Sequence, residues 1–342
     1  MSTKKIKIGQ IGICHEHANG KMVTMKLMSD IFEIVGVVDD RETSVTPRRI
    51  NDVDKCYDGI PFMTEEELLN TPGLQAVTVE VPNNELVPTS LRCLERNLPI
   101  HMDKPGGEDL ELFSQLRKGY ADRNLPFQMG YMFRGNPAIQ WCIKAIHEGW
   151  LGDIFEIQAN MSHNYGDDDY QKYIGKFKGG IMYNLGCHLI DLIIPMLGRP
   201  AEVTPFLKSA PGWPDSVKNN CMTIMEYPNC TVTLRACSLE VGGHSRRRLK
   251  ICGTNGTVEL SPLERFDGKP LLMDLALKED IPGYEAGEHI VDFGTVRDRY
   301  ESQMLELAKM VNGEMENPYT YEHDYLVQEV LLAAAGYTTW RK

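Results

Sequence analysis

The sequence predicts an α/β fold, in which an N-terminal doubly wound parallel sheet precedes an α+β domain with an open, mostly antiparallel sheet. Over the first 130 residues, short apolar runs alternate with helical periodicity, which is typical of a parallel sheet covered on both faces. Later segments alternate in polarity and are separated by turn signals such as Asn255-Gly256, which indicate antiparallel hairpins. We therefore expect domains over 1–130 and 131–342, with C-terminal helices able to pack back on the first domain.

In the first domain, strands and helices are expected to follow one another in turn. The strands are expected at 5–12, 33–39, 75–81, 98–102 and 126–130. The helices are expected near 18–29, 64–70, 86–97 and 108–122. Sheets of this kind bind ligands beside the carboxyl ends of their strands, so the residues that follow each strand are the first candidates for a site.

The second domain is expected to open with a helix that has Ile139, Ile143 and Ile146 on one side, followed by a strand over 154–160. Further along the chain, a helix near 181–197 precedes strands at 219–227, 230–239, 246–253 and 256–260. Two amphipathic helices are expected at the end, around 300–311 and 326–337.

Composition excludes several classes of partner. The formal charge of −12 on 342 residues argues against nucleic acid and anionic membranes, which both require clustered positive charge. The one dense basic run, Arg246-Arg247-Arg248, is interpreted as an exposed sheet face. No stretch is long and apolar enough to span a membrane or to act as a signal region. The nine cysteines include no C-x-x-C pair, so we expect a cytoplasmic protein with reduced thiols.

The segment "GQIGICHEHANGK" (9–21) lies where a dinucleotide-binding fold carries G-x-G-x-x-G. Gly12 retains the tight turn, but Cys14 and His17 occupy the other two glycine positions, where close approach of the backbone to pyrophosphate and to the sheet is needed. The helix N-terminus still favours phosphate, and His15 and His17 could donate hydrogen bonds to it. We therefore predict a modified dinucleotide site that includes Gly12, Ile13, Cys14, His15 and His17.

Two further features bear on this site. Asp39 ends the second strand, where a carboxylate holds the ribose of NAD, although a plain turn residue would look the same and Arg41 keeps NADP open as an alternative. A metal bound by Cys14, His15, Glu16 and His17 is also conceivable. Adjacent ligands on one turn rarely converge on one ion, and no distant ligand pair completes the set, so no metal is expected.

Two segments of the chain, "LPIHMDKPGG" (98–107) and "GGIMYNLGCHLID" (179–191), carry the motifs D-K-P and N-x-G-x-H. Together these motifs resemble the E-K-P and D-x-G-x-H of the Gfo/Idh/MocA family, the group of glucose–fructose oxidoreductase and inositol dehydrogenase. The resemblance covers most of the chain, with "MGYMFRGNPA" (129–138), "EGWLGDI" (148–154), "GTNGTVEL" (253–260) and "YEHDYLVQEVLLAAAGY" (321–337) in order.

This resemblance implies a Rossmann domain that binds NAD, with NADP as the alternative, and chemistry on sugars, cyclitols or related polyols. It implies that Lys104 hydrogen-bonds the reacting oxygen and that His188 moves the hydroxyl proton. The chemistry is reasonable on its own terms, because oxidation of an alcohol removes a hydride and a proton, and histidine titrates near neutral pH. A surface lysine and a satisfied helix-start histidine are the alternatives. The family also implies a homo-oligomer, a dimer or tetramer formed through the second domain's sheet.

Other candidates depend more heavily on the resemblance. Pro82, Asn83 and Asp103 are expected along the cofactor, and Asn184 is expected beside His188. Residues that could reach the substrate are Tyr131, Arg134, His163 and Tyr165, although core packing or a solvated loop would explain them as well.

Three departures from the family pattern qualify the functional prediction: the changed glycine turn, Asp103 in place of glutamate and Asn184 in place of aspartate. An amide at Asn184 does not raise the histidine pKa as a carboxylate would. An NAD(P)-dependent dehydrogenase or reductase is the main prediction. The alternatives are a hydrolase or lyase that cleaves glycosides through transient oxidation by bound NAD, and a catalytically silent ligand-binding protein.

Overall fold

The computed structural model describes residues 5–44, 54–164 and 168–340. The chain divides into two compact units: unit 1 comprises Met1–Tyr131 with Tyr300–Gln328, and unit 2 comprises Met132–Arg299 with Glu329–Lys342. Among the described residues, no helix combines the length and the apolar character needed to cross a bilayer. All nine cysteines fall within the described ranges, and all are free thiols.

Unit 1 is built on a six-stranded sheet in the order β3-β2-β1-β4-β5-β6. Every neighbouring pair runs parallel, and the order changes direction at β1, as in doubly wound dinucleotide-binding folds. The parallel sheet predicted for this half of the chain is confirmed. The strands are β1 (Ile6–Ile11), β2 (Phe32–Val38), β3 (Phe62–Met63), β4 (Ala76–Val79), β5 (Ile100–Met102) and β6 (Phe127–Met129).

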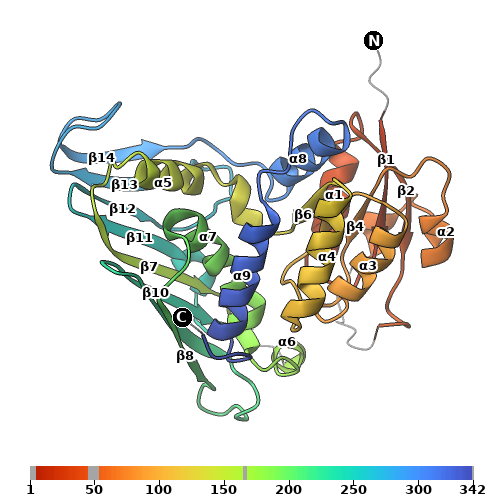
Figure 1. Ribbon diagram of the computed structural model, residues 1–342, viewed down its shortest axis with the longest axis horizontal. Helices are drawn as coiled ribbons and strands as arrows, with labels where there is room; N and C mark the ends of the chain where they lie inside the picture. The colour runs from red at the N-terminus through yellow and green to blue at the C-terminus, as the bar shows by residue number, and fades with distance from the viewer. Residues whose placement is uncertain (1–4, 45–53, 165–167, 341–342) are drawn as a thin grey trace. The chain divides into compact units, whose positions relative to one another are not determined.

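Helices connect the strands of unit 1 and pack beside one another in pairs (Figure 1). One pair is α3 with α4, and another is α1 with α8, a helix from the C-terminal part of the chain. The apolar faces of α1 and α8 bury methionines such as Met22, Met25 and Met304 in the core against β1 and β2. The helices are α1 (Ala18–Leu27), α2 (Glu65–Leu69), α3 (Leu86–Glu95), α4 (Leu110–Asp122) and α8 (Glu301–Val311), with a short 3-10 turn at Asp54–Tyr57.

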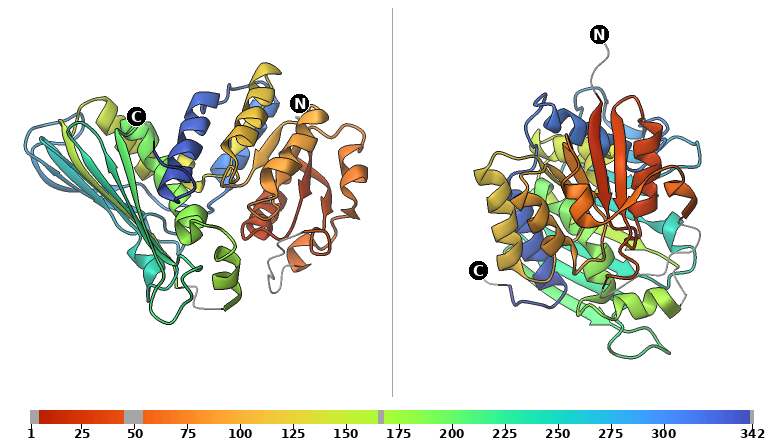
Figure 2. Two further views of the ribbon diagram at one scale, coloured as in Figure 1. Left: turned by 60° about the horizontal axis from the view of Figure 1, so that its bottom comes forward. Right: turned by 90° about the vertical axis from the view of Figure 1, so that its right-hand side faces the viewer.

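Unit 2 is built on an eight-stranded sheet in the order β14-β13-β12-β11-β7-β10-β9-β8, whose strands lie side by side in one layer (Figure 2). All pairs are antiparallel except β7 with β10. The mostly antiparallel sheet predicted here is confirmed, but β8, β13 and β14 were not predicted. The strands are β7 (Ile154–Ser162), β8 (Glu202–Lys208), β9 (Asn220–Glu226), β10 (Thr231–Cys237), β11 (Arg248–Gly253), β12 (Gly256–Leu260), β13 (Leu272–Leu277) and β14 (Gly287–Asp292).

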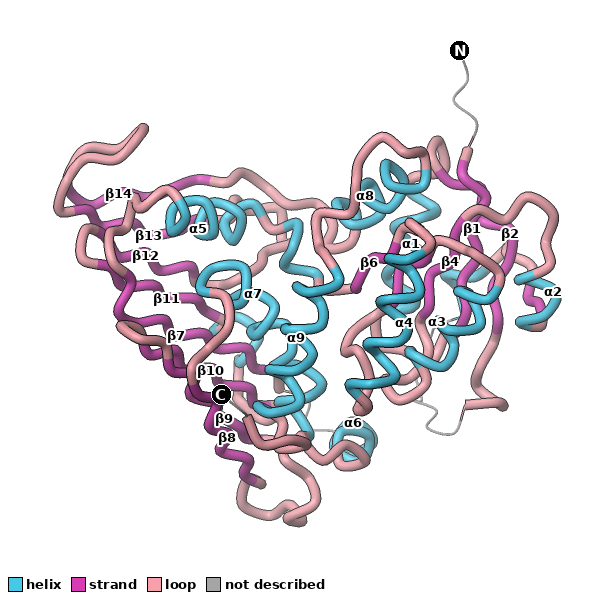
Figure 3. Tube along the Cα trace, in the orientation of Figure 1, coloured by secondary structure: helices cyan, strands magenta, loops and turns pink. Residues whose placement is uncertain are grey.

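Helices α5 and α7 of unit 2 pack on each other beside the sheet, and α7 contacts β7 (Figure 3). Helix α5 begins where Asn136 accepts hydrogen bonds from the N–H groups of Ala138 and Ile139 and Pro137 occupies the first turn, both favourable for a helix start. The helical elements are η2 (Met132–Gly135), α5 (Pro137–His147), α6 (Asp168–Ile174), the π-helical segment η3 (Met182–Gly186), α7 (Cys187–Leu197) and η4 (Gly243–Arg246). Helix α9 (Tyr321–Ala334) contains the boundary between the units.

Candidate functional site

The glycine turn of unit 1 connects β1 to α1 and retains one position that only glycine can occupy. Gly12 has φ of +94°, and a Cβ on it would lie 2.7 Å from the carbonyl carbon and oxygen of Glu80. At the second glycine position, the side chain of Cys14 is buried in the core of unit 1. The turn therefore accommodates Cys14 by directing its side chain inward.

The carboxylate beside this turn belongs to Asp40, the residue after the predicted Asp39. Oδ1 of Asp40 accepts hydrogen bonds from the N–H groups of Ile13 at 2.7 Å and Cys14 at 3.0 Å. Burial raises the pKa of Asp40 by more than these hydrogen bonds lower it. The carboxylate of Asp39 instead pairs with the guanidinium of Arg41, with Nη2 at 2.5 Å from Oδ2. Asp40 thus occupies the place beside the turn at which the sequence predicts Asp39.

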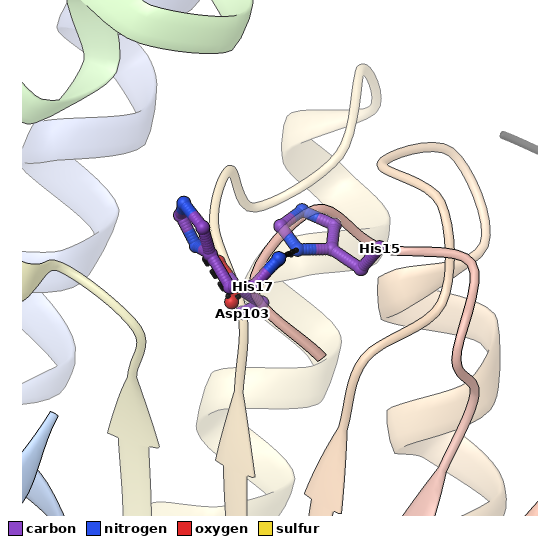
Figure 4. Close-up of side chains that lie close together, drawn as sticks. All are labelled: His15, His17 and Asp103. Carbon is purple, nitrogen blue, oxygen red and sulfur yellow. Dashed lines mark hydrogen bonds and ion pairs between the residues drawn. The ribbon is translucent and has the colours of Figure 1, made fainter. Parts of the chain in front are cut away.

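Two histidines of the turn contact residues that follow neighbouring strands. The N–H of His17 donates to Nδ1 of His15, so Nε2 of His15 carries the proton that it shares with Oδ1 of Asn83 at 3.2 Å. Nδ1 of His17 lies 3.1 Å from Oδ2 of Asp103 (Figure 4). Burial lowers the pKa of His15 to about 3 and also lowers that of His17, so both rings are neutral near pH 7.

Lys21, on the buried side of α1, supplies the positive charge of this cluster. Its Nζ lies 2.5 Å from Oδ2 of Asp103 and 2.8 Å from Oε1 of Glu80, and all three side chains are fully buried. Burial holds the pKa of Glu80 well above its usual range. Burial would also raise the pKa of Asp103, but the ammonium of Lys21 and the hydrogen bond with His17 outweigh it and hold that pKa well below its usual range. The ammonium of Lys21 thus lies between the carboxyl groups of Asp103 and Glu80, and burial opposes ionisation of Glu80.

The same side chains have the geometry of a metal site, since ligand atoms of His15, His17 and Asp103 all lie within 4.8 Å of one another. Two imidazoles and a carboxylate suit zinc. However, the ammonium of Lys21 already lies 2.5 Å from the carboxylate of Asp103, so an added cation would be repelled at short range in a buried environment. The expectation that no metal binds here stays a prediction, and Lys21 now supports it.

Lys104 follows Asp103 directly and is held at both ends by carboxylates. Its backbone N–H donates to Oδ1 of Asp103 at 2.6 Å, and its Nζ lies 3.3 Å from Oε1 of Glu16. The side chain of Lys104 is fully buried, and its peptide bond to Pro105 is cis. The turn at 12–17 and the D-K-P segment therefore form one ionic network within unit 1.

In unit 2, the predicted Asn184 and His188 lie one turn apart along continuous helix. Asn184 belongs to the π-helical η3 and His188 to the start of α7, and π-helical turns are frequent at functional sites. Nδ2 of Asn184 donates to the hydroxyl of Tyr170 at 2.9 Å. The His188 ring meets the Phe133 ring edge to face, with centroids 5.9 Å apart. An aromatic ring thus packs against His188, and the Asn184 side chain one turn before it is held by a tyrosine hydroxyl.

Among the residues predicted to reach the substrate, Arg134 and His163 make contacts with charged side chains of the protein. Nη2 of Arg134 lies 2.6 Å from Oδ1 of Asp191, in a buried, two-pronged ion pair that joins η2 to α7. His163 contacts Nη2 of Arg247. Tyr131 is buried at the end of unit 1, and Tyr165 lies outside the described residues.

The interpretation of the basic run as an exposed sheet face is wrong for Arg247. Arg246 and Arg248 are exposed, but Arg247 is fully buried, and its Nη1 lies 2.5 Å from Oε1 of Glu264. A carboxylate 17 residues further along the chain supplies the charge partner that a buried guanidinium requires.

Sequence reasoning missed Glu80, Lys21 and Tyr170. The sequence contains a signal for the first two but none for the third. Glu80 is an acidic residue directly after a buried strand, and Lys21 interrupts the apolar side of a helix at the spacing of Met25 and Met28, so both were visible in principle. Tyr170 gave no signal beyond its residue type. Its role beside Asn184 depends on the placement of α6.

The chain was compared with protein-family models and with curated protein sequences. Residues 139–259 match the family model described as the GFO/IDH/MocA C-terminal domain. The chain is 24% identical over 176 residues to the scyllo-inositol 2-dehydrogenase (NADP(+)) IolW of Bacillus subtilis, covering 50% of this chain and 49% of the relative. It is 29% identical over 163 residues to the uncharacterized oxidoreductase YhhX of Escherichia coli, covering 45% and 44%. The matched segment thus spans about half of each curated relative.

Solved structures resemble the chain over nearly its whole length. GenD2 from gentamicin A biosynthesis, in complex with NAD, superposes with a TM-score of 0.77 at 16% identity, covering 99% of this chain and 97% of that one. KijD10, a 3-ketoreductase from Actinomadura kijaniata in complex with TDP-benzene and NADP, gives 0.75 at 15% identity, covering 96% of each chain. At these identities the likeness establishes the fold.

Proposed function

Since the chain belongs to the Gfo/Idh/MocA family, we propose that it is an NAD(P)-dependent oxidoreductase that transfers a hydride between nicotinamide and a hydroxyl or carbonyl group of a sugar, cyclitol or related polyol. The observation that carries this proposal is the buried network of the turn and the D-K-P segment, in which Lys104 is fixed at its backbone N–H and at its ammonium. A precisely held lysine suits a catalytic group better than a surface one.

The residues beside the turn fit a dinucleotide. Oδ2 of Asp40 is buried without a hydrogen-bond partner among the described residues, and a ribose hydroxyl could donate to it. Gly12 lets the turn pass close to the end of β4, because a Cβ there would lie 2.7 Å from the carbonyl group of Glu80. We therefore assign ribose binding to Asp40. The remaining residues of the turn, together with Pro82 and Asn83, lie along the cofactor in this proposal.

NAD is the preferred cofactor in this proposal, with NADP as the alternative. Two successive carboxylates, Asp39 and Asp40, follow β2, and negative charge there repels the 2′-phosphate of NADP. Arg41 could otherwise bind that phosphate, but its guanidinium is engaged by Asp39. The two similar proteins differ in cofactor: the IolW relative is named as an NADP(+) enzyme, and the GenD2 structure contains NAD. The preference for NAD therefore rests on Asp39, Asp40 and Arg41 of this chain.

Two side chains of the protein perform the proton chemistry. The ammonium of Lys104 donates a hydrogen bond to the reacting oxygen and stabilises the charge that develops on it. His188 takes the hydroxyl proton during oxidation and returns it during reduction. The nicotinamide, when bound, accepts or supplies the hydride. Asn184 assists His188 as a neutral hydrogen-bonding group.

The proposal is tested by following NADH and NADPH formation with a panel of polyols, cyclitols and sugars. Formation of either reduced nucleotide with a member of the panel, lost in Lys104→Ala and in His188→Ala, is the expected result. Product release from a glycoside without net nucleotide reduction would favour the hydrolase or lyase alternative instead.

We also propose that the chain forms a homo-oligomer through the open face of the second sheet. Phe206 and Met222 lie opposite one another on β8 and β9, and both are exposed, as is Ile290 on β14. Exposed apolar groups on one sheet face favour association. Light scattering should give a dimer or tetramer, and Phe206→Glu should shift it toward the monomer. A monomeric wild type would contradict this.

A further inference from the structure

We propose that Glu16 is a positioning residue for Lys104: its carboxylate holds the lysine side chain in place and keeps it in the protonated, hydrogen-bond-donating form. Glu16 belongs to the segment that replaces the glycine turn, between the changed positions Cys14 and His17. This inference rests on the proposed function of Lys104 and assigns a use to the altered turn.

The contact that carries the inference joins a partly exposed side chain, Glu16, to a fully buried one, Lys104. Oε1 of Glu16 lies 3.3 Å from Nζ of Lys104, and the side chains are 15% and 0% exposed. A buried ammonium is costly without a compensating charge, and Glu16 supplies one at the ammonium. Because Glu16 also reaches solvent, its loss should be tolerated far better than the loss of a fully buried group.

The backbone of Lys104 is anchored independently of Glu16. Its N–H donates to Asp103, and Asp103 is itself held by Lys21 at 2.5 Å and by His17 at 3.1 Å. Replacing Glu16 therefore leaves these anchors of the D-K-P segment in place and removes a charge that contacts the ammonium of Lys104, together with a 3.9 Å contact between Glu16 and His17. This separation makes a local effect on Lys104 distinguishable from a general loss of structure.

The other titratable groups that face Lys104 remain when Glu16 is changed. His15 and His17 lie on the turn and Asp103 lies at the end of β5, and burial keeps the two imidazoles neutral near pH 7. The charge of Asp103 is shared with Lys21. Removing the carboxylate of Glu16 should therefore destabilise the protonated form of Lys104 without a compensating change nearby.

The test is a pH titration of lysine side-chain NMR signals in wild type and in Glu16→Gln, with Lys104→Arg used to assign the signal. The amide is isosteric, so the deprotonation midpoint of Lys104 should move to lower pH by about one pH unit. Glu16→Asp keeps the charge and should lie closer to wild type, which preserves the test if Glu16→Gln folds poorly. An unchanged midpoint in both variants would overturn the inference.

Glu65→Gln is the matched control, since it removes a glutamate that pairs with Arg92 on the surface of the same unit. This variant should leave the Lys104 midpoint unchanged. In the active enzyme, the fall of kcat/KM at alkaline pH should also begin at a lower pH in Glu16→Gln than in wild type. If wild type shows no nucleotide-dependent activity, the proposed function fails, while the NMR titration still decides the role of Glu16.

Discussion

The turn of unit 1 and the start of α7 in unit 2 stabilise their candidate catalytic groups in different ways. Lys104 belongs to a network of buried ionisable groups, in which Asp103 is bound by Lys21 and His17. His188 packs against the Phe133 ring, and its neighbour Asn184 hydrogen-bonds the Tyr170 hydroxyl. Ion pairs contact the first group, whereas an aromatic ring packs against the second.

The altered glycine turn of unit 1 is held by specific polar contacts. His17 contacts Asp103, and Glu16, which precedes His17, contacts Lys104. The altered residues therefore connect the turn to the D-K-P segment. We expect substitutions in this network to act through charge and those beside the Phe133 ring to act through packing, and this contrast can be tested.

The largest effect is expected from His188→Ala. Loss of a general acid–base group should lower kcat by about 10²- to 10⁴-fold. NADH affinity should change less than about twofold, because the residues assigned to the cofactor belong to unit 1. Steady-state kinetics and calorimetry measure the two quantities. His147→Ala, which removes an exposed histidine of α5, is the control, and a loss of less than about threefold in His188→Ala would contradict the assigned role.

Lys21→Met should lower the free energy of unfolding by about 3–5 kcal/mol, because it leaves the buried Asp103 without its cation. Lys26→Met, on the same helix, removes hydrogen bonds to two backbone carbonyls near the surface and should cost less than about 1.5 kcal/mol. Urea unfolding followed by circular dichroism compares the two. Equal losses would mean that the buried network contributes no more than the surface contacts.

Asp40→Asn and Asp39→Asn separate the two acidic residues that follow β2. A hydrogen bond to a charged group contributes about 1.5–3 kcal/mol, so Asp40→Asn should weaken NADH binding by about tenfold or more. Asp39→Asn should weaken it by less than about threefold, since Asp39 pairs with Arg41. Calorimetric titration gives both values. The reverse order would return ribose binding to Asp39.

The last prediction concerns the pH dependence of stability, to which His101 on β5 is expected to contribute. His101 is fully buried, and burial lowers its pKa to about 3. The unfolded chain binds a proton at this histidine below pH ~6.5, whereas the folded chain does not until about pH 3, so this contribution to stability is lost as the pH falls through that window. Its share of the slope is about 1.4 kcal/mol per pH unit.

His101→Gln should therefore flatten the fall in unfolding free energy between pH 6 and pH 4, even if its stability at neutral pH is lower. His147→Gln, at an exposed position, should retain the wild-type slope. Urea unfolding at several pH values measures this. Equal slopes in His101→Gln and wild type would show that the folded protein tolerates a charged His101.

Local patterns predicted the architecture, because strands and helices leave periodic traces in the sequence. The apolar runs at β1, β4 and β5 and the Asn255-Gly256 turn between β11 and β12 are such cases. The weaker strands β8, β13 and β14 were missed. Their alternation includes exposed apolar residues such as Phe206 and Ile290, which blurs the contrast between buried and exposed faces.

The candidate site was harder to predict, because its members are far apart in the sequence. Lys21 meets Glu80 and Asp103 across 59 and 82 residues, and no local pattern indicates that a lysine will be buried there. Asp39 and Asp40 differ by one position, and successive side chains in extended backbone point to opposite sides. The acidic end of β2 was therefore predictable, but the residue that contacts the turn was not.

The most direct test of the central claim, that the altered turn still binds a dinucleotide, is a calorimetric titration of nucleotide-stripped protein with NADH and NADPH in parallel. We predict that NADH binds and that NADPH binds at least about tenfold more weakly, a difference of about 1.4 kcal/mol. Absence of binding by either nucleotide at millimolar concentration would contradict the proposed oxidoreductase and favour a ligand-binding role.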